Sequence, residues 1–442
     1  MGKGTRDENF ENNIDPHVSI LHGPITIISE ADLLSFPNKT GNGTALDPYI
    51  IENLEIDAQN VASAVLITNT NSHLVIRNCT LFNSGSNMQD AGIRLFNCTN
   101  LNVINCTFLD NYNGLYVRET PYCNYSSNII KDNFYGVQAF NTNNSLIFNN
   151  SIVNNSADGI FLDVSNFNNI SHNYLANNSN YGTYSSYSLG NTIENNVIEN
   201  NNDAGIYLFW SEFETINYNN ITQSNKNPGV DVYIAQNCTI NGNQFSNCGL
   251  VFDGTSQVIA SHTVPQTNLV NGKIVYFYAN QVNLVNANYS NPGQIILVNC
   301  NNSQISGFNI TNTTAGILLY TCENNNISNN TVTYTLHGVV LAYFSKYNNI
   351  QFNNLSFNEV SGLNVHVSGF NNLTGNIASD GGEIGARLLG SSNNTLEGNE
   401  FSRNSLFGIY LDSSAVNNTV YFNKIEDNIW SEAYCENNTN YF

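Results

Sequence analysis

Aromatic and charged side chains recur at two fixed places in a repeated segment of this sequence. These places lie two and four residues after glycines that are 20 to 24 residues apart. Over seven consecutive repeats, from Gly92 to Gly229, eight of the fourteen positions hold Tyr or Phe. Aromatic faces can stack on the apolar C–H faces of sugar rings, and Arg or Asp can bond their hydroxyls. The pattern predicts carbohydrate binding if the fold places these side chains on one surface.

The candidate glycan-binding residues come from these two positions and from the turn that follows them. They are Tyr116, Arg118, Phe140, Phe161, Asp163, Tyr184, Tyr207, Phe209, Trp210, Asp231 and Tyr233. Two other interpretations stay open, because rings in strands also pack on one another and exposed apolar patches also mark protein contacts. We favour glycan binding.

The same glycines predict the fold. Fifteen of them lie between Gly92 and Gly408 at this spacing, and twelve of the fifteen precede an apolar-x-apolar triplet. The repeats hold short runs of alternating apolar residues that fit three strands. Leucine-rich, WD and kelch repeats need other frames or lengths. The pattern predicts an all-β protein, a single-stranded right-handed parallel β-helix with about 16 rungs of 22–24 residues. One straight coil of that size would be a rod roughly 75–80 Å long.

A second register predicts an asparagine ladder, in which stacked side-chain amides hydrogen-bond along the coil axis and tolerate the left-handed backbone of the bend. Its members lie two residues before the apolar position of the third strand. They are Asn128, Asn150, Asn173, Asn196, Asn219 and Asn243, and later Asn330, Asn353, Asn376, Asn399 and Asn423. We interpret the ladder as structural.

Three segments are expected. Residues 1–16 are predicted to be a flexible N-terminal tail, and residues 17–60 an N-terminal cap with entering strands. Within the cap, Ser29 and Asp32 suggest a capping box at the start of a helix. Residues 61–442 form the coil, with distorted rungs and larger loops at 255–291.

Charge excludes one class of partner. The net charge is −21 with only 13 Lys and Arg, so we expect no nucleic-acid binding. No apolar run has the length of a transmembrane helix, and we expect an export signal to lie outside this sequence. The oligomeric state is not predicted.

The chain resembles the right-handed β-helix superfamily of archaeal and bacterial surface proteins over roughly residues 18–442. The resemblance rests on the segment Gly41–Glu52, the Gly-Ile-x-Leu strands and the segment Asn271–Tyr278. NosD-like proteins and the carbohydrate-binding and sugar-hydrolysis β-helices share this repeat. The resemblance implies an extracellular or cell-surface protein, with polysaccharide or a surface glycan as partner. If the protein is exported, the loop sequons at Asn38, Asn42 and Asn288 are the candidate glycosylation sites, and most other sequons are by-products of the repeat.

Catalysis is less favoured than binding, and the question stays open. The paired aspartates, Gly-His-Gly and Arg-x-Lys of pectin-type hydrolases are missing. Asp163 and Asp231 lie three rungs apart, roughly 14 Å, too far for a glycosidase pair. His366 with Arg387 on the next rung is the best remaining acid/base pair. We assign no catalytic residue. A polysaccharide lyase or hydrolase, and a structural surface rod or adhesin spacer, remain the alternatives.

We expect no metal site and no cofactor, with Ca²⁺ needed only by a lyase. The two Met and seven scattered His form no copper-ligand cluster, so a copper-related role is not favoured. The nine Cys show no zinc spacing, and Cys79 and Cys106 occupy the inward ladder slot. Cys300 and Cys322, 22 residues apart on adjacent rungs, could form a disulfide, which would imply an oxidising compartment.

Overall fold

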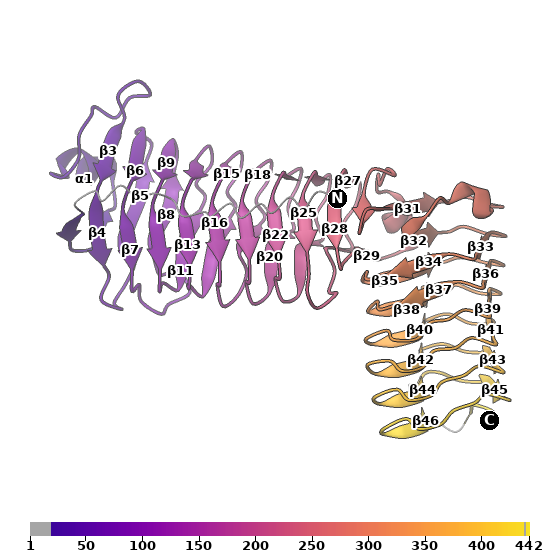
Figure 1. The fold of residues 1–442 in the computed structure, drawn as a ribbon. Coiled ribbons are helices and arrows are strands. Elements are labelled where there is room, and N and C mark those ends of the chain that lie inside the picture. The colour runs from indigo at the N-terminus through magenta and orange to yellow at the C-terminus, as the bar shows by residue number, and fades with distance from the viewer. Residues whose placement is uncertain (1–18, 437–438) are drawn as a thin grey trace, which may run out of the picture.

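The computed structural model describes residues 19–436 and 439–442, and nearly all of them lie in short parallel strands (Figure 1). The strands wind into about 17 turns of a right-handed β-helix, which confirms the predicted fold class. The predicted tail 1–16 lies outside the described residues.

Each turn of the first coil adds one strand to each of three sheets. The first sheet has ten strands: β2 (Ile25–Ile27), β5 (Val65–Thr70), β8 (Ala91–Cys98), β11 (Asn113–Arg118), β14 (Tyr135–Phe140), β17 (Ile160–Asp163), β20 (Tyr181–Ser186), β23 (Ala204–Phe209), β26 (Val230–Tyr233) and β29 (Leu250–Asp253). The second sheet has nine strands: β3 (Tyr49–Glu52), β6 (Leu74–Arg77), β9 (Leu101–Ile104), β12 (Asn124–Ser126), β15 (Leu146–Phe148), β18 (Asn169–Ser171), β21 (Thr192–Glu194), β24 (Thr215–Asn217) and β27 (Thr239–Asn241). The third sheet contains β1 (Ile20–His22), β4 (Leu54–Asp57), β7 (Thr80–Phe82), β10 (Thr107–Leu109), β13 (Ile129–Lys131), β16 (Ser151–Val153), β19 (Tyr174–Ala176), β22 (Val197–Glu199), β25 (Asn220–Thr222) and β28 (Gln244–Ser246).

The second coil repeats this winding. Its largest sheet continues the third sheet and contains β32 (Pro292–Val298), β35 (Ala315–Tyr320), β38 (His337–Ala342), β40 (Ser361–His366), β42 (Ile384–Leu389), β44 (Phe407–Leu411) and β46 (Ser431–Cys435). Its other strands are β33 (Gln304–Ser306), β36 (Asn326–Ser328), β39 (Asn349–Gln351), β41 (Asn372–Thr374), β43 (Thr395–Glu397) and β45 (Thr419–Tyr421), with β34 (Asn309–Thr311) and β37 (Thr331–Thr333) as a pair.

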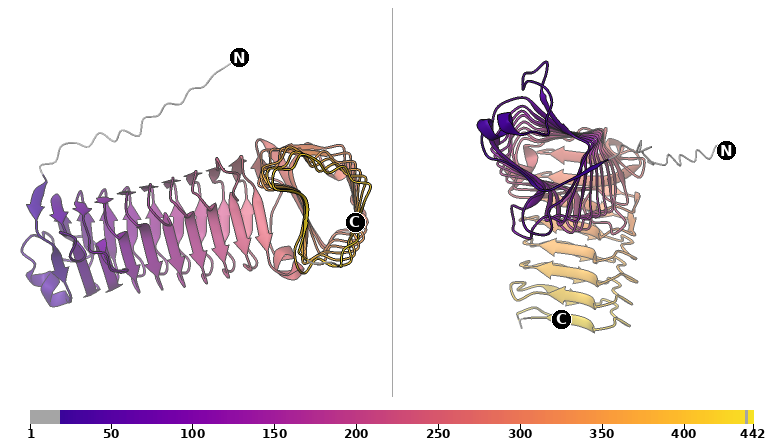
Figure 2. Two further views of the ribbon diagram at one scale, coloured as in Figure 1. Left: turned by 90° about the horizontal axis from the view of Figure 1, so that it is seen from below. Right: turned by 90° about the vertical axis from the view of Figure 1, so that its left-hand side faces the viewer.

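The structure differs from the predicted straight rod, because two coils meet at a corner and form an L (Figure 1). Figure 2 shows the second coil down its axis in a view that shows the first coil from the side. Residues 255–291, predicted as distorted rungs of one coil, connect the two. They form helix α2 (Ser256–Ala260), strands β30 (Leu269–Val270) and β31 (Lys273–Ala279), and the 3-10 turn η1 (Asn286–Asn288).

Strand direction reverses at this corner. Strand β30 pairs in parallel with β28 but antiparallel with β31, and β31 then pairs in parallel with β32. Gly272 therefore lies in a hairpin with φ of 76°, and its place in the 20-to-24-residue spacing does not mark a rung. The hairpin redirects the chain, and the second coil starts along a new axis.

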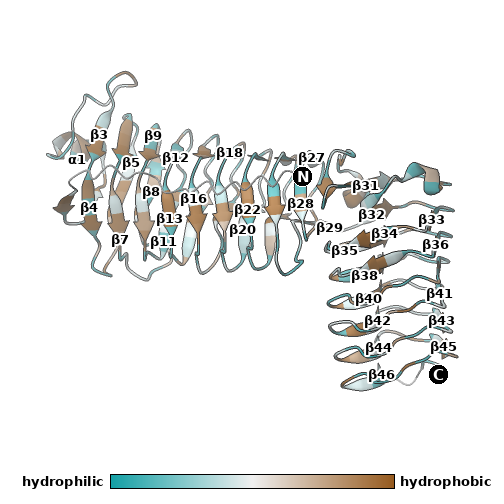
Figure 3. Cartoon of the chain, viewed as in Figure 1, coloured by the Kyte–Doolittle hydropathy of each residue, from teal (hydrophilic) through white to brown (hydrophobic). Residues whose placement is uncertain are grey.

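The apolar residues that alternate along each strand point inward and form the interior of each coil, and hydrophilic turns separate the strands (Figure 3). The recurrent glycines have a packing reason. A Cβ on Gly136 would lie 2.3 Å from the carbonyl oxygen of Gly159 on the next rung, so no side chain fits there. This close backbone approach explains why glycine recurs once per turn.

The predicted asparagine ladder is confirmed in both coils. Asn173 donates from Nδ2 to Oδ1 of Asn196 at 3.0 Å, and Asn196 donates in the same way to Asn219 at 3.0 Å. In the second coil Asn353 donates to Asn376 at 2.9 Å. One detail was wrong, because the left-handed residue is the one before each ladder asparagine. The ladder amide thus points inward while its neighbour makes the bend.

Further ladders account for the asparagine content, which is about one residue in five. One runs through Asn111, Asn133, Asn155, Asn178 and Asn201, and another in the second coil runs from Asn325 through Asn348, Asn371 and Asn394 to Asn418. Several corners of the coil are therefore tied along the axis.

Helix α1 (Glu30–Ser35) covers the open end of the first coil. Ser29 is its N-cap and accepts a hydrogen bond from the backbone N–H of Asp32, as the sequence predicts. Leu33 on this helix is fully buried against the coil interior. The apolar core of the first turn is thereby kept from water.

Candidate functional site

The outer face of the first sheet carries the predicted residues in two columns. Parallel pairing sets Phe161 beside Tyr184 and Tyr184 beside Tyr207 in one column. In the other column Phe209 lies beside Tyr233. We call this surface the aromatic strip. It comprises Tyr116, Phe140, Phe161, Tyr184, Tyr207, Phe209 and Tyr233.

The rings of the strip contact one another from rung to rung. Ring centroids are 4.9 Å apart for Phe161 and Tyr184, and 5.0 Å apart for Tyr184 and Tyr207. Phe209 stacks on Tyr233 at 5.4 Å with the rings nearly parallel. These rings are half-buried, so each keeps part of its surface for a ligand while its neighbours hold it in place.

The N-terminal end of the strip offers little surface. Tyr116 is only 6% exposed, and the guanidinium of Arg94 lies over its ring at 5.9 Å. Arg118 is exposed and lies over Phe96, with an ion pair to Glu119. A ring covered in this way cannot also stack on a sugar, so the accessible strip begins at Phe140.

Trp210 lies at the edge of the strip, 49% exposed, where the chain turns from the first sheet toward the second. Tyr187, which sequence reasoning missed, stacks on it from the previous rung with centroids 6.3 Å apart and is 55% exposed. Both have positive φ, 50° and 46°. Their shared place directly after the fourth position of adjacent repeats is the signal that could have identified Tyr187.

The strip ends in acidic residues. Asp231 follows Tyr207 in its column, and Asp253 follows Tyr233 in the other. Burial first, and then the nearby charge of Asp253, raise the pKa of Asp231 to about 7. Asp253 stands four residues after Gly249, so one more repeat of the pattern would have found it. Asp163 lies further back, beside Phe140.

The second coil forms a wall beside these carboxylates. The ring of Tyr343, in the turn directly after β38, lies 5.7 Å from that of His366 on the outer face of β40. Burial, and then a hydrogen bond to Asp253, raise the pKa of Tyr343. Lys226 of the first coil forms an ion pair with Glu359 of the second at 2.7 Å. We call the region that contains Asp231, Asp253, Tyr343 and His366, where the two coils meet, the inner corner.

The acid/base pair considered from the sequence is not brought together as a pair. His366 aligns with Leu389, and Arg387 aligns with Asn364, so the two lie diagonally on the wall. Arg387 instead lies near His337. Burial, and then the positive charge of Arg387, lower the pKa of His337 to about 4.

Cys300 and Cys322 do not form the disulfide that their spacing made possible. Both thiols are free and buried, and the backbone N–H of Cys300 donates to Sγ of Cys322 at 3.4 Å. Side chains in register point the same way, so each sulfur meets the backbone of the neighbouring rung. Cys79 and Cys106 are buried thiols as predicted, and burial raises the pKa of Cys106.

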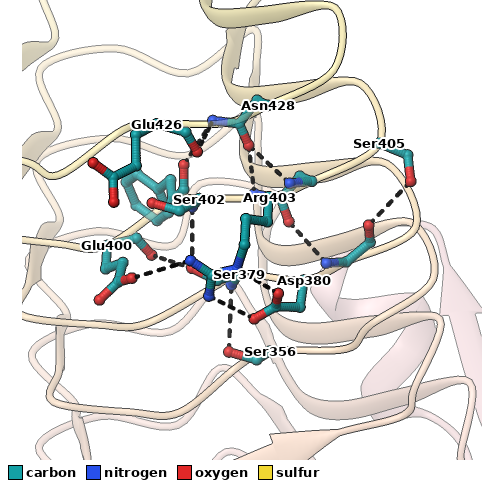
Figure 4. A network of polar contacts seen from close by, with 12 residues as sticks. Ser356, Ser379, Asp380, Glu400, Ser402, Arg403, Ser405, Glu426 and Asn428 are labelled. Carbon is teal, nitrogen blue, oxygen red and sulfur yellow. Dashed lines mark hydrogen bonds and ion pairs between the residues drawn. The ribbon is translucent and has the colours of Figure 1, made fainter.

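A charged network connects neighbouring rungs of the second coil (Figure 4). Arg403 makes a bidentate pair with Asp380 at 2.7 and 2.8 Å, and this contact lowers the pKa of Asp380. Lys424 contacts both Glu400 and Glu426. These charges satisfy one another between rungs, which is a structural role.

A hollow lined by aromatic side chains lies on the last rungs of the second coil. Its lining includes Phe407, Tyr410, Trp430 and Tyr434, with Glu436 accepting a hydrogen bond from Tyr410 at 2.6 Å. The rings of Tyr410 and Tyr434 stack at 5.7 Å. This hollow is remote in sequence from the aromatic strip.

Together, the winding, the ladders and the ring-lined outer face define a right-handed parallel β-helix protein. A family model described as right handed beta helix region matches residues 63–220, and one described as periplasmic copper-binding protein (NosD) matches 198–361 and 259–442. The latter matches together cover more than half of the chain, so the chain belongs to the NosD family. No curated protein sequence matches the chain.

Several solved structures are similar to it. The A-module of the Azotobacter vinelandii mannuronan C-5 epimerase is 12% identical, with a TM-score of 0.30 over 75% of this chain and 90% of that one. The surface adhesin PfbA of Streptococcus pneumoniae is 11% identical, with a TM-score of 0.32 over 84% and 83%. The catalytic domain of a GH87 α-1,3-glucanase is 14% identical, with a TM-score of 0.35 over 92% and 63%.

The family description names copper, and the described residues of this chain do not gather into a copper centre. Copper prefers thiolate, thioether and imidazole ligands. Within residues 19–436 and 439–442, no three side chains of His, Cys, Asp or Glu gather as a metal site. The buried thiols instead meet backbone carbonyls, as Cys106 does with Ile104. In the same residues no helix is long and apolar enough to cross a membrane.

Proposed function

We propose that this β-helix protein binds a polysaccharide or surface glycan along the aromatic strip. The observation that supports the proposal is the row of half-buried rings from Phe140 to Tyr233, which one sheet holds at the spacing of its rungs. Rungs rise about 4.8 Å, so alternate rings lie about 9.6 Å apart, a spacing that can follow a linear glycan. Because the rings are already fixed by their neighbours, little side-chain entropy is lost on binding.

Location outside the cytoplasm is part of the proposal. The family description places NosD in the periplasm, and a surface glycan is met only outside the cytoplasm. The net charge of −21 also suits a protein that stays soluble beside polymers without binding nucleic acid.

Replacing Trp210 by Asn is expected to weaken glycan retention in affinity gels about tenfold or more, since Trp commonly dominates binding energy. Asn tolerates the positive φ of 50°, so the melting temperature should be nearly unchanged. Tyr218→Asn is the matched control. Tyr218 is 59% exposed, has φ of 53° and lies at the turn between β24 and β25, away from the first sheet.

Retention should be screened on neutral and acidic polysaccharides. If the wild type is retained by none, or if Trp210→Asn and Tyr218→Asn behave alike, the strip is not the glycan-binding surface. Loss of retention in Tyr434→Ala but not in Trp210→Asn would assign binding to the hollow on the second coil.

A carbohydrate-active enzyme is the second candidate, and the juxtaposition of Asp231 with Asp253 favours it. A carboxyl with a raised pKa beside a second carboxylate is the arrangement that glycosidic-bond chemistry needs. Release of reducing ends from a retained glycan, abolished by Asp231→Asn, would establish this activity. Retention without product supports binding alone.

A further inference from the structure

The second coil lies across the end of the first. Strand β29 is the last strand of the first sheet, and side chains of the second coil bond its free edge. The backbone N–H of Leu250 donates to Oε1 of Gln294 at 3.0 Å, and Nε2 of Gln294 donates to the carbonyl of Leu250 at 2.8 Å. The N–H of Phe252 donates to the hydroxyl of Tyr320 at 3.4 Å.

Apolar packing makes this junction rigid. Tyr320, Leu318 and Val340 point outward from the second coil, yet they are buried in the same core as Phe252 of the first coil. The coils are also joined through Lys226 and Glu359. The wall beside the aromatic strip is therefore a fixed part of the fold.

The strip runs directly into this wall. Its last ring is Tyr233, Asp253 follows Tyr233 in the same column, and Asp253 raises the pKa of Tyr343 on the wall. At the other end the outer face of the first sheet continues over earlier rungs toward β8. A linear polymer that lies on the strip can extend past the first rungs, but it cannot pass the second coil.

We infer that the inner corner is a terminal subsite that receives one end of a neutral glycan chain. The inference rests on the proposed function of the strip and adds which part of the glycan is bound and of which class. The end unit of a glycan carries a hydroxyl that internal units use in their linkages. Asp231, Asp253, Tyr343 and His366 supply acceptors and donors for such hydroxyls, and Tyr233 supplies a ring face.

The negative charge of the inner corner determines which class of glycan can bind there. Two carboxylates converge at the inner corner, Lys226 is already paired with Glu359, and the charge of Arg387 on the wall lies beside His337. Burial contributes most to the raised pKa of Asp231, and the nearby charge of Asp253 raises it further. A uronate or sulfated polymer would place its own negative charge against these carboxylates, so these polymers are disfavoured and uncharged sugars are accepted.

The test uses neutral linear hexasaccharides of the cello, laminari, manno and malto series, measured by calorimetry with the full chain. Each is used unmodified and in two blocked forms, one conjugated at the reducing end and one capped at the non-reducing end. One block should weaken binding about tenfold or more, and the other should have little effect. β-Cyclodextrin, a ring without ends, should bind more weakly than the linear malto series.

Two variants test whether the binding of a glycan end depends on side chains of the inner corner. Asp253→Asn and His366→Gln should each weaken binding of the hexasaccharides about tenfold while long polysaccharide is still retained through the strip. Glu194→Gln, on the outer face of the second sheet, should change neither. Melting temperatures would show whether Asp253→Asn loosens the junction, and His366→Gln tests the subsite independently.

The outcomes separate the two proposals. If polysaccharide is retained but neither block and neither variant matters, the terminal subsite is refuted and the strip remains. Tighter binding of a uronate oligomer than of its neutral counterpart overturns the assigned class. If nothing is retained at all, the proposed function itself fails.

Discussion

Replacing Glu214 by Gln is expected to stabilise the protein by a few kcal/mol above pH 8 and to change its stability little below pH 4.5. Glu214 is fully buried inside the first coil, where it continues the ladder of Asn168 and Asn191. Its Oε1 accepts a hydrogen bond from Nδ2 of Asn191 at 3.0 Å, while Oε2 meets no partner among the described residues.

Burial raises the pKa of Glu214 from 4.5 to about 8. Below pH 4.5 the carboxyl is protonated in both the folded and unfolded states, so it adds no pH dependence. Between about 4.5 and 8 the unfolded chain releases the proton while the folded chain keeps it, and stability falls as pH rises. Above pH 8 the loss is complete. Gln is neutral at every pH and avoids the loss.

Urea denaturation at pH 4.5, 6.5 and 8.5 would measure this difference. The exposed Glu212→Gln is the control, and its effect on the free energy of unfolding should stay below about 0.5 kcal/mol. A constant difference between Glu214→Gln and wild type across this range would show that the carboxyl is not held neutral in the ladder.

Asn196→Leu should lower the free energy of unfolding by about 3 kcal/mol or more, because it removes several buried hydrogen bonds at once. Asn196 donates from Nδ2 to the carbonyl of Ile170 at 2.8 Å and to Oδ1 of Asn219 at 3.0 Å. Its Oδ1 accepts from the backbone N–H and from Nδ2 of Asn173, at 2.8 and 3.0 Å. Leu has a similar size but leaves these groups unpaired.

Asn202→Leu provides the comparison, since its exposed side chain makes only a 3.4 Å contact with Asp203. We expect a cost below about 0.5 kcal/mol in the same urea titration. Equal costs at the two positions would contradict the structural importance of the ladder.

The periodic part of the molecule could be predicted from sequence because it depends on neighbours one turn away. Glycine recurs where backbones of adjacent rungs approach, as at Gly136, and asparagine recurs where amides stack, as at Asn196. Both requirements repeat with every turn, so they leave a period in the sequence. The columns of the strip follow from the same period, and Asp253 would have been found by extending it.

The buried state of Tyr116 could not be predicted in this way. The alternating pattern places it correctly on the outer face, but Arg94 and neighbouring rings cover it. Whether neighbouring side chains cover a ring depends on their conformations on adjacent rungs, and the repeat period of the sequence does not specify those conformations. The free thiols of Cys300 and Cys322 belong to the same class, because proximity of Cα atoms does not decide where a sulfur points.

The coil, its period and the face that carries the rings could be predicted from the sequence, since these are set by local contacts repeated at every turn. The presence of two coils, and the wall that closes the strip, became visible only in the folded molecule. Gly272 and Gly293 keep the spacing through residues 255–291, so the period continues while the strand direction reverses. The contacts that hold the corner, such as Leu250 with Gln294, each occur only once. A contact made once, between segments far apart in the chain, leaves no repeat in the sequence from which to infer it.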